Sequence, residues 1–506
     1  MRSKRSADAG APAAASPEGR VPSTVWLMAL GIVAIELSVS ARYGYHRDEL
    51  YFLAAGRRLA WGYVDQPPLT PALARLSDLL LGGSVVGLRL WSALALGAIV
   101  LLAAALAREL GGGRRAMTLA AASMAASTLF LTLGHLLSTA TFDALAWVIV
   151  LLLVARLLRG ADARLWLVVG VVGGIALLNK HLVAMLAVAL LAGLLLGRRA
   201  ELLRSPWPWA GLAVAGAMAL PNVVWQARHG WTQAEAASVA GETGGPAGGL
   251  LQLLFLPLTL NPVLMPIWVW GLVWLLRAHD SRSFRPLGWV WVAIVVITLG
   301  VGGKFYYAAP ATVPLLAAGS VAIERRLESG NRTATPVVAG VLASGLLLSP
   351  LGVPVLPPAW LPTVPVHEVN PELAEMIGWP LLVEHVADVH RSLPPEERRR
   401  AAILTLNYGE AGAIERFGPA YGLPRPASGH NNYWLWGPPE ESADVVIAVG
   451  QSRSYLERLF DHVRLAATHR TPYGIENEEH GAPIWICRRP RGTWEELWPH
   501  VKGYSA

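Results

Sequence analysis

The run TVWLMALGIVAIELSVSA (24–41) is the first of a series of apolar segments that recur along the chain to about residue 350. Each segment is of about the length that crosses a bilayer and is ended by charged residues or by Gly and Pro. Only 15% of the 506 residues are charged, whereas soluble proteins have about 25%. The sequence therefore predicts a polytopic, all-α membrane domain with about eleven transmembrane helices. The expected spans are 24–41, 85–107, 116–134, 142–158, 165–178, 182–197, 207–225, 262–276, 286–302, 304–323 and 335–352.

Basic residues gather at every second connection between these segments. Examples are Arg108, Arg156, Arg199, Arg277 and Arg325. Because basic loops remain in the cytoplasm, the loops 42–84, 135–141 and 226–249 are expected to face outward. The basic residues are spread over short loops instead of forming one face of a folded domain, which excludes nucleic acid as a partner.

The chain is expected to divide into three parts. Residues 1–23 would form a cytoplasmic tail, 24–352 the transmembrane domain with its outer loop 42–84, and 353–506 a soluble domain. The short apolar segment 250–260 is expected to be interfacial or an extra helix. Taken as interfacial, it leaves an odd number of crossings, so the C-terminal domain would lie outside a multi-pass protein of the cell (plasma) membrane.

The C-terminal part has a pattern typical of a small α/β domain. Its expected strands are AAILTL (401–406), ADVVIAVG (443–450) and APIWICR (482–488). The aromatic and amide-rich stretch HNNYWLW (430–436) would suit carbohydrate stacking or a buried aromatic core. The single cysteine, Cys487, excludes an internal disulfide and a cysteine-based metal cluster, and it is expected to be buried.

The first outer loop begins RYGYHRDELYFLAAGRRLAWGYVDQPPLTP (42–71) and concentrates acids, bases and aromatics against the membrane. Asp48 and Glu49 are adjacent, and neighbours on a helix point about 100° apart, so only one of them can face a given site. The alternative is a solvated first turn of an interfacial helix. Asp65 stands just before two prolines that stiffen the backbone, or it is an ordinary turn aspartate.

Other candidate residues lie on the same outer face. Asp143 is at the mouth of the fourth expected span, where a buried carboxylate is costly and therefore often functional. The run 165–197 is expected to fold as a hairpin with Lys180 at its recessed tip, where the lysine would bind an anion or extend towards water. Lys304 is a second cation at an outward edge, with Tyr307 behind it. His46, beside the acidic pair, is a further candidate for substrate binding.

On these residues the chain resembles the GT-C class of membrane glycosyltransferases, in particular bacterial relatives of protein O-mannosyltransferases and lipid A aminoarabinose transferases. The resemblance covers about residues 24–325. The matching elements are the Asp48, Glu49 pair, YVDQPPL (63–69), STATFDAL (138–145), LNKH (178–181) and KFYYAAP (304–310).

The resemblance implies a GT-C fold and inverting transfer of a sugar from a polyprenyl-phosphate donor to an outer acceptor, which is a glycan, lipid or protein. It implies that Asp48 is the catalytic base, with Glu49 as its alternate. It also implies that Asp65 holds the acceptor or the donor sugar, that Asp143 is the second-loop acid, and that Lys180 and Lys304 bind the donor phosphate. Relatives often have a lysine at the position of Gln66, so this chain lacks one expected cation.

Two other functions remain open at this point. One is a transporter or flippase of a lipid-linked sugar, which the lack of related halves argues against. The other is a membrane-anchored binding or scaffold protein, which leaves the outer acids and lysines unexplained. No cofactor is required by the sequence, although the carboxylates could hold a divalent metal ion.

Overall fold

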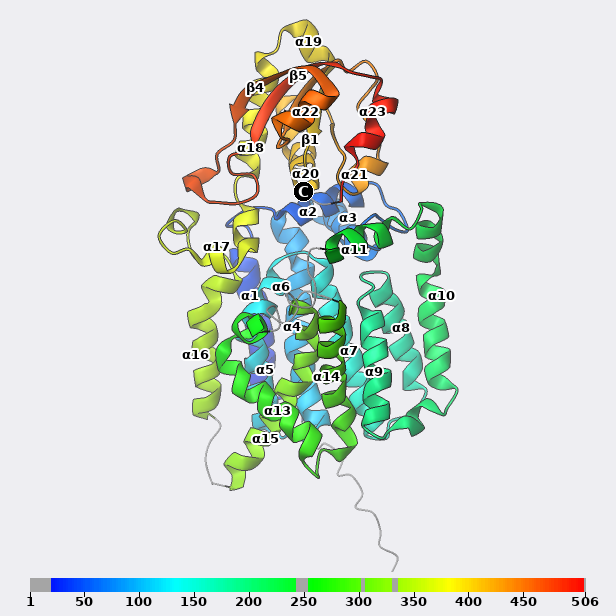
Figure 1. The fold of residues 1–506 in the computed structure, drawn as a ribbon. Helices are drawn as coiled ribbons and strands as arrows, with labels where there is room; N and C mark the ends of the chain where they lie inside the picture. Colours follow the sequence, from blue (N-terminus) through cyan, green and yellow to red (C-terminus); the bar gives the residue numbers. More distant parts are fainter. Residues whose placement is uncertain (1–19, 243–253, 302–304, 330–334, 505–506) are drawn as a thin grey trace, which may run out of the picture.

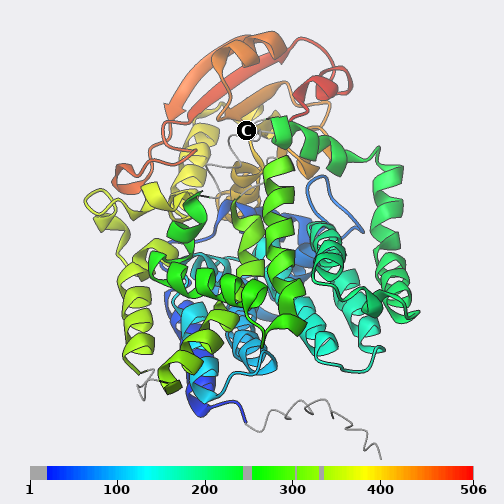
Figure 2. The same cartoon turned by 60° about the horizontal axis from the view of Figure 1, so that its bottom comes forward.

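The computed structural model describes residues 20–242, 254–301, 305–329 and 335–504. A bundle of helices carries a small five-stranded sheet at one end (Figure 1). After rotation, the orange and red strands still lie at that end only (Figure 2). The predicted combination of a mostly helical membrane protein with a small C-terminal sheet is confirmed.

The bundle contains fifteen labelled α-helices between Ser23 and Gly352, and the structure gives their bounds as follows. They are α1 (Ser23–Val39), α2 (Arg47–Gly56), α3 (Leu69–Leu81), α4 (Val85–Glu109), α5 (Arg114–Ala125), α6 (Thr128–His135), α7 (Thr139–Leu158), α8 (Leu165–Leu177), α9 (Val183–Leu196), α10 (Trp207–Arg228), α11 (Thr232–Glu242), α13 (Met265–Arg277), α14 (Arg285–Val301), α15 (Val313–Ser329) and α16 (Thr335–Gly352).

Six helices in the described part of the chain are long and apolar enough to cross a membrane, or up to eight if each bent pair is one span. The helices α5 and α6 form one such pair, bent by 63°, and a helix at 254–260 with 262–277 forms the other, bent by 105°. Shorter apolar helices are α1, α8 and α9. The segments expected to span the membrane thus coincide with helices, and the chain is a multi-pass membrane protein.

Glycines bring two pairs of helices into close contact. A Cβ atom on Gly170 of α8 would lie 2.2 Å from the Gly211 carbonyl oxygen of α10. Likewise, a Cβ on Gly271 of α13 would lie 1.9 Å from the Leu315 carbonyl oxygen of α15. Since lipid supplies no hydrophobic force between apolar helices, close backbone approach is how such helices gain packing contacts.

The basic connections lie together at the end of the bundle that is opposite the sheet (Figure 1). There Arg156 donates to Glu109 at 3.1 Å, and Arg199 donates to the carbonyl of Leu158 at 3.2 Å. The arginine pattern of the sequence therefore corresponds to one end of the fold. The N-terminal tail up to residue 19, and parts of the segments 226–249 and 250–260, lie outside the described residues.

The C-terminal region forms a sheet with the strand order β2-β1-β3-β5-β4. Strands β1 and β3 are parallel to each other and β1 is parallel to β2, whereas β5 runs antiparallel to β3 and β4. The three predicted strands are confirmed as β1, β3 and β5, and β2 and β4 were not predicted. Cys487 on β5 is buried, as expected. The strands are β1 (Ala401–Thr405), β2 (Pro426–Ser428), β3 (Val445–Val449), β4 (Phe460–Thr468) and β5 (Pro483–Pro490).

Helix α20 lies between the sheet and α2 of the first outer loop (Figure 1). A capping box of Asn407 and Glu410 begins α20 directly after β1. Gly412 permits close contact, because a Cβ there would lie 2.9 Å from the backbone of Leu50. The remaining C-terminal helices are α17 (Val366–Val369), α18 (Trp379–Ser392), α19 (Pro395–Arg400), α20 (Tyr408–Phe417), α21 (Asn432–Leu435), α22 (Arg453–Leu459) and α23 (Trp494–Val501).

Candidate active site

Helix α2 places the two adjacent acids of the first outer loop. The His46 side chain caps the helix by accepting from the Asp48 N–H at 3.2 Å, and the Glu49 carboxylate accepts from the His46 N–H at 2.8 Å. This reciprocal arrangement satisfies backbone donors that have no partner within the helix. It also fixes the directions of Asp48 and Glu49, which diverge as neighbours on a helix must.

Glu49 points into the bundle and is completely buried. Its Oε1 and Oε2 accept from the Arg89 guanidinium of α4 at 2.9 and 2.8 Å, and the N–H of Leu137 donates to it at 3.1 Å. Arg89 is itself only 1% exposed and also donates to the Ser40 and Gly44 carbonyls. Glu49 therefore joins the outer loop to the bundle and has no free face.

Asp48 points the other way, towards the C-terminal region, and its side chain is 38% exposed. The Tyr408 hydroxyl of α20 donates to Asp48 Oδ1 at 2.7 Å. Burial, with Asp48 next, raises the pKa of the Tyr408 phenol well above its usual range, so the phenol stays protonated and donates. Asp48 is thus an oriented carboxylate that remains open to a ligand.

Asp65 lies close enough to Asp48 to interact with its charge, at the contact with the C-terminal region. Its Oδ1 accepts from the Tyr51 hydroxyl at 2.9 Å, and its Oδ2 accepts from the Asn431 amide at 3.2 Å. Desolvation of its carboxylate raises the pKa of Asp65 to about 6, the charge of Asp48 adds to this effect, and the hydrogen bonds from Tyr51 and Asn431 oppose it. The carboxylate therefore titrates close to neutral pH.

Three segments that are far apart in the sequence meet below Asp65. The Thr70 hydroxyl donates to Asn179 Oδ1 at 2.8 Å, and the Asn179 amide donates to the carbonyl of Thr139 at 2.7 Å. The N–H of Leu69 donates to the carbonyl of Leu178 at 2.9 Å. The DQPPLT segment, the tip of the α8–α9 hairpin and the start of α7 are therefore one connected structure.

The hairpin tip carries Lys180 to the second group of candidate residues. Its ammonium lies 5.3 and 5.6 Å from the ring centres of Tyr306 and Tyr307, within cation–π range. Asp143 of α7 is 4% exposed, accepts from the Trp147 indole at 3.2 Å and interacts electrostatically with Lys180. The structure thus brings Asp143, Lys180 and Tyr307 together, whereas Lys304 lies outside the described residues.

His46 lies in a different environment from Asp48 and Asp65. It is 4% exposed, and its Nε2 lies 3.0 Å from the Glu372 carboxylate. Burial alone would lower its pKa, but the Glu372 hydrogen bond and the nearby acids raise it to about 9. Its Nδ1 accepts from the Asp48 N–H and its Nε2 faces Glu372, so His46 caps the helix between protein groups and neither ring nitrogen is directed at Asp65.

The C-terminal region supplies site residues that the sequence did not single out individually. Tyr408 holds Asp48, Asn431 holds Asp65, and the Asn432 side chain accepts from the N–H of Val64 at 2.6 Å. Asn431 has a φ of 49°, which is strained for a residue with a side chain and is typical of functional sites. The signal that could have indicated them was the amide-rich HNNYWLW stretch, whose His430, Asn431, Asn432 and Tyr433 are buried.

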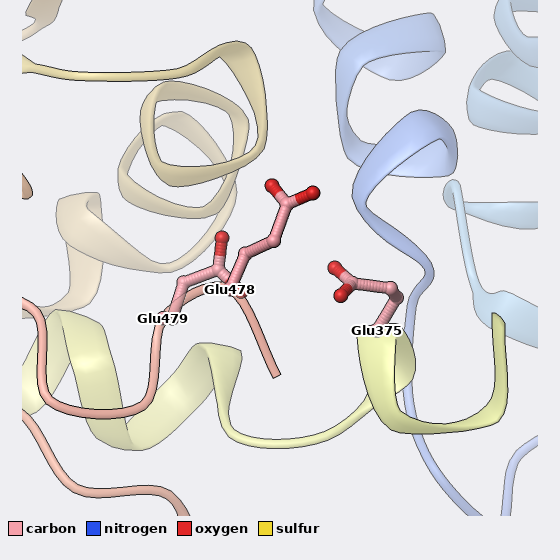
Figure 3. Close-up of side chains that lie close together, drawn as sticks. All are labelled: Glu375, Glu478 and Glu479. Carbon is pink, nitrogen blue, oxygen red and sulfur yellow. The ribbon is translucent and has the colours of Figure 1, made fainter. Parts of the chain in front are cut away.

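A cluster of three glutamates lies next to this site. Glu375, Glu478 and Glu479 direct their carboxylates towards one another from two segments of the C-terminal region (Figure 3). Arg47, beside the catalytic candidate Asp48, forms an ion pair with Glu478 and lies 3.8 Å from Glu375. In the described chain this is where carboxylates are close enough to hold a metal ion, and Arg47 supplies a positive charge there.

The structure is that of a multi-pass membrane protein with a GT-C-type fold, in which an acidic site lies under a C-terminal α/β region. Residues 65–225 match the model of the family described as dolichyl-phosphate-mannose-protein mannosyltransferase. No curated protein sequence gives a significant match.

Solved structures share the fold over nearly the whole chain. ArnT from Cupriavidus metallidurans in the apo state is 16% identical, with a TM-score of 0.60 over 92% of this chain and 98% of ArnT. The same protein bound to undecaprenyl phosphate gives a TM-score of 0.59 at 16% identity and the same coverage. The arabinofuranosyltransferase AftD from mycobacteria is 15% identical, with a TM-score of 0.51 over 94% of this chain and 40% of AftD.

At these identities the structural matches establish the fold, and together with the family match they confirm the resemblance to GT-C glycosyltransferases. The matching family model carries the name of a sugar transferase, and this match does not favour the transporter alternative.

Proposed function

We propose that this protein is an inverting glycosyltransferase that moves a sugar from a polyprenyl-phosphate donor to an acceptor outside the cell membrane. The observation that carries the proposal is the hydrogen-bonded junction of Thr70, Asn179 and Thr139, which unites the first outer loop, the hairpin tip and the second outer loop. Through it, the segment that carries Asp65 is joined to the hairpin tip that carries Lys180 and to the start of the helix that carries Asp143. ArnT, which has the same fold, has been solved with undecaprenyl phosphate bound. This complex supports a lipid-phosphate donor for the present protein.

Asp48 is proposed as the general base. An acceptor hydroxyl attacks the anomeric carbon, its proton passes to the Asp48 carboxylate, and the bond from that carbon to the phosphate oxygen breaks. The lipid phosphate leaves with the bonding electron pair, and attack from the opposite face inverts the configuration. The exposed side chain of Asp48 supports this role over Glu49, whose oxygens are occupied by Arg89.

Lys180 is proposed to bind the donor phosphate, together with Lys304. The two tyrosine rings and Asp143 hold the ammonium near the outer edge of the bundle, where a lipid phosphate would lie. Because a leaving phosphate needs positive neighbours, we expect Lys180→Gln to raise the KM for the donor and to lower kcat. Steady-state kinetics with varied donor would measure both, and an unchanged KM would argue against phosphate binding at this residue.

Asp65 is proposed to bind sugar hydroxyls as an ionised carboxylate that accepts their hydrogen bonds. This role makes the rate of sugar transfer dependent on pH. Since its pKa is about 6, we expect kcat/KM to fall as the pH decreases through about 6. The pKa of Asp65 in the folded protein lies above the ordinary value for aspartate. The contribution of this side chain to the stability of the fold is therefore fully present at low pH and is lost as the pH rises through about 6. Asp65→Asn should therefore lose activity at pH 7.5 and keep its thermal stability.

The pH profile of wild type and Asp65→Asn, measured beside their thermal unfolding, tests this assignment. An inflection near pH 6 that persists in the variant would assign the titration to a different group. A large loss of stability in the variant at neutral pH would show that Asp65 acts mainly as a structural residue.

A donor assay tests the function as a whole. Purified protein would be incubated with radiolabelled polyprenyl-phosphate hexoses and pentoses and a membrane extract as acceptor, with Asp48→Asn in parallel. Label moved by the wild type only would support the transferase and begin to identify the sugar. If no donor yields a glycosyl product and the protein moves a lipid-linked sugar across proteoliposomes, the assignment is wrong.

We further propose that the arginine-rich end of the bundle faces the cytoplasm and that the C-terminal α/β region, from about residue 353, lies outside. The clustering of basic connections at one end supports this orientation, which follows from the positive-inside rule. Labelling of Cys487 is unsuitable because this thiol is buried. A cysteine introduced at Arg464, an exposed position on β4, should react with a membrane-impermeant maleimide in intact spheroplasts.

A further inference from the structure

A crevice of about 490 Å³ lies in the C-terminal region at the carboxyl ends of β1 and β3. Thr405 and Leu406 line it from the end of β1, and Gly450 and Gln451 line it from the end of β3. The chain leaves β1 towards β2 and leaves β3 towards the opposite edge of the sheet. Adjacent parallel strands whose connections diverge in this way form a crevice where α/β proteins bind ligands.

Two buried polar atoms of this crevice have no hydrogen-bond partner among the described residues. They are Oε1 of Gln451, a residue that is 3% exposed, and Nδ1 of His430, a residue that is 6% exposed. A buried polar group without a partner destabilises a fold, because burial removes its hydrogen bonds to water and no hydrogen bond within the protein replaces them. Both atoms belong to residues that line the crevice.

The charge of the crevice indicates which ligand it suits. Arg458, His500 and Lys502 line it, and none of its lining residues is acidic. Lys502 is paired with Glu235 of α11 at 3.0 Å, but no carboxylate among the described residues pairs with Arg458. Tyr455 and Ser452 add an aromatic face and a hydroxyl. The Arg458 guanidinium lies 5.4 Å from the centre of the Tyr455 ring and keeps its charge without a carboxylate partner among the described residues. A basic crevice with aromatic and hydroxyl groups suits a saccharide that carries an anionic group.

The crevice is connected to the candidate base. The His430 ring lies 4.8 Å, between ring centres, from Tyr408, whose hydroxyl donates to Asp48. The next residue, Asn431, is strained and donates to Asp65. Two aromatic rings, those of His430 and Tyr408, therefore connect a ligand in the crevice to Asp48, the group that would receive the acceptor proton.

We propose that this crevice binds an anionic saccharide, a phosphorylated or carboxylated sugar unit of the acceptor, with Arg458 on the anion and Gln451 and His430 on its hydroxyls. Its role as acceptor site rests on the proposed transferase function, whereas saccharide binding itself does not. The C-terminal α/β region then selects the acceptor and presents it to Asp48.

The test is direct binding to purified full-length protein in lipid nanodiscs without donor, so that no transfer takes place. Glucose 6-phosphate, glucuronate, glucose and inorganic phosphate would be titrated by calorimetry and by saturation-transfer NMR. We expect one or both anionic sugars to bind more tightly than glucose and phosphate, and the stronger of the two identifies the anion. Equal binding of inorganic phosphate and glucose 6-phosphate would overturn the saccharide assignment.

Three variants locate the binding. Arg458→Gln should weaken the binding of the anionic sugar by about tenfold or more, as expected for the loss of a hydrogen bond from a charged group. Arg453→Gln, on the same helix but paired with Glu457 and outside the crevice, is the matched control and should bind as wild type. Gln451→Leu removes an unpartnered buried atom, so it should retain thermal stability and still lose affinity.

Equal affinities in wild type and Arg458→Gln would overturn the proposal. The donor assay described above is independent of this result. Tight binding without any sugar transfer would contradict the proposed function but not the saccharide site, and transfer without a preference for anionic sugars would contradict the site alone.

Discussion

Replacing Asp48 by asparagine is expected to reduce sugar transfer by about 10²–10⁴-fold, the usual contribution of a general base. Asparagine preserves the size of the side chain and can still accept from Tyr408, so the geometry of the site remains. It cannot take the proton from the acceptor hydroxyl. Turnover of a labelled polyprenyl-phosphate sugar by purified protein would measure the loss.

The control for this variant is Asp78→Asn, in the same outer loop. Asp78 forms ion pairs with Arg57 and Arg75 at the surface, and surface pairs contribute little to stability. We expect this variant to keep its activity. Tyr408→Phe, which removes one hydrogen bond to Asp48, should give a smaller loss than Asp48→Asn. Full activity in Asp48→Asn would rule out Asp48 as the base.

The second large effect is expected for Arg89→Met, which should destabilise the protein by about 3–5 kcal/mol. Arg89 and Glu49 are both almost completely buried, and removal of the guanidinium leaves the Glu49 carboxylate without a countercharge. The carbonyls of Ser40 and Gly44 also lose a donor. Thermal unfolding in detergent, followed by tryptophan fluorescence and by the fraction of monodisperse protein, would measure this effect.

Arg57→Met is the matched control for Arg89→Met, because the same substitution is then made in a half-exposed ion pair with Asp78. We expect Arg57→Met to lower the free energy of unfolding by less than about 1 kcal/mol. Similar unfolding temperatures for the two variants would contradict a structural role of the Glu49–Arg89 pair. If Glu49→Gln unfolds like wild type but is inactive, Glu49 and not Asp48 would be the preferred base.

Local sequence patterns were sufficient to predict the helices and part of the sheet. An apolar run of membrane-spanning length must satisfy its backbone hydrogen bonds internally, so it has to become a helix wherever it lies. The hairpin at 165–197 could be predicted, with its tip at Asn179, Lys180 and His181, because the run is too long for one helix and both of its ends are followed or preceded by arginines. Strand β2 was not predicted, because a run as short as Pro426–Ser428 has no periodicity of its own and pairs only once β1 is present.

The sequence alone also determined which residue types could do chemistry and that Asp48 and Glu49 must point apart, since this follows from the rotation per residue in a helix. Only the tertiary structure decided which of the two carboxylates stays exposed, because Arg89, 40 positions away along the chain, occupies Glu49. The same is true of Tyr408 and Asn431, which reach Asp48 and Asp65 across more than 350 residues. Such contacts depend on how the C-terminal sheet rests on α2, and pairings between distant segments leave no local pattern in a single sequence.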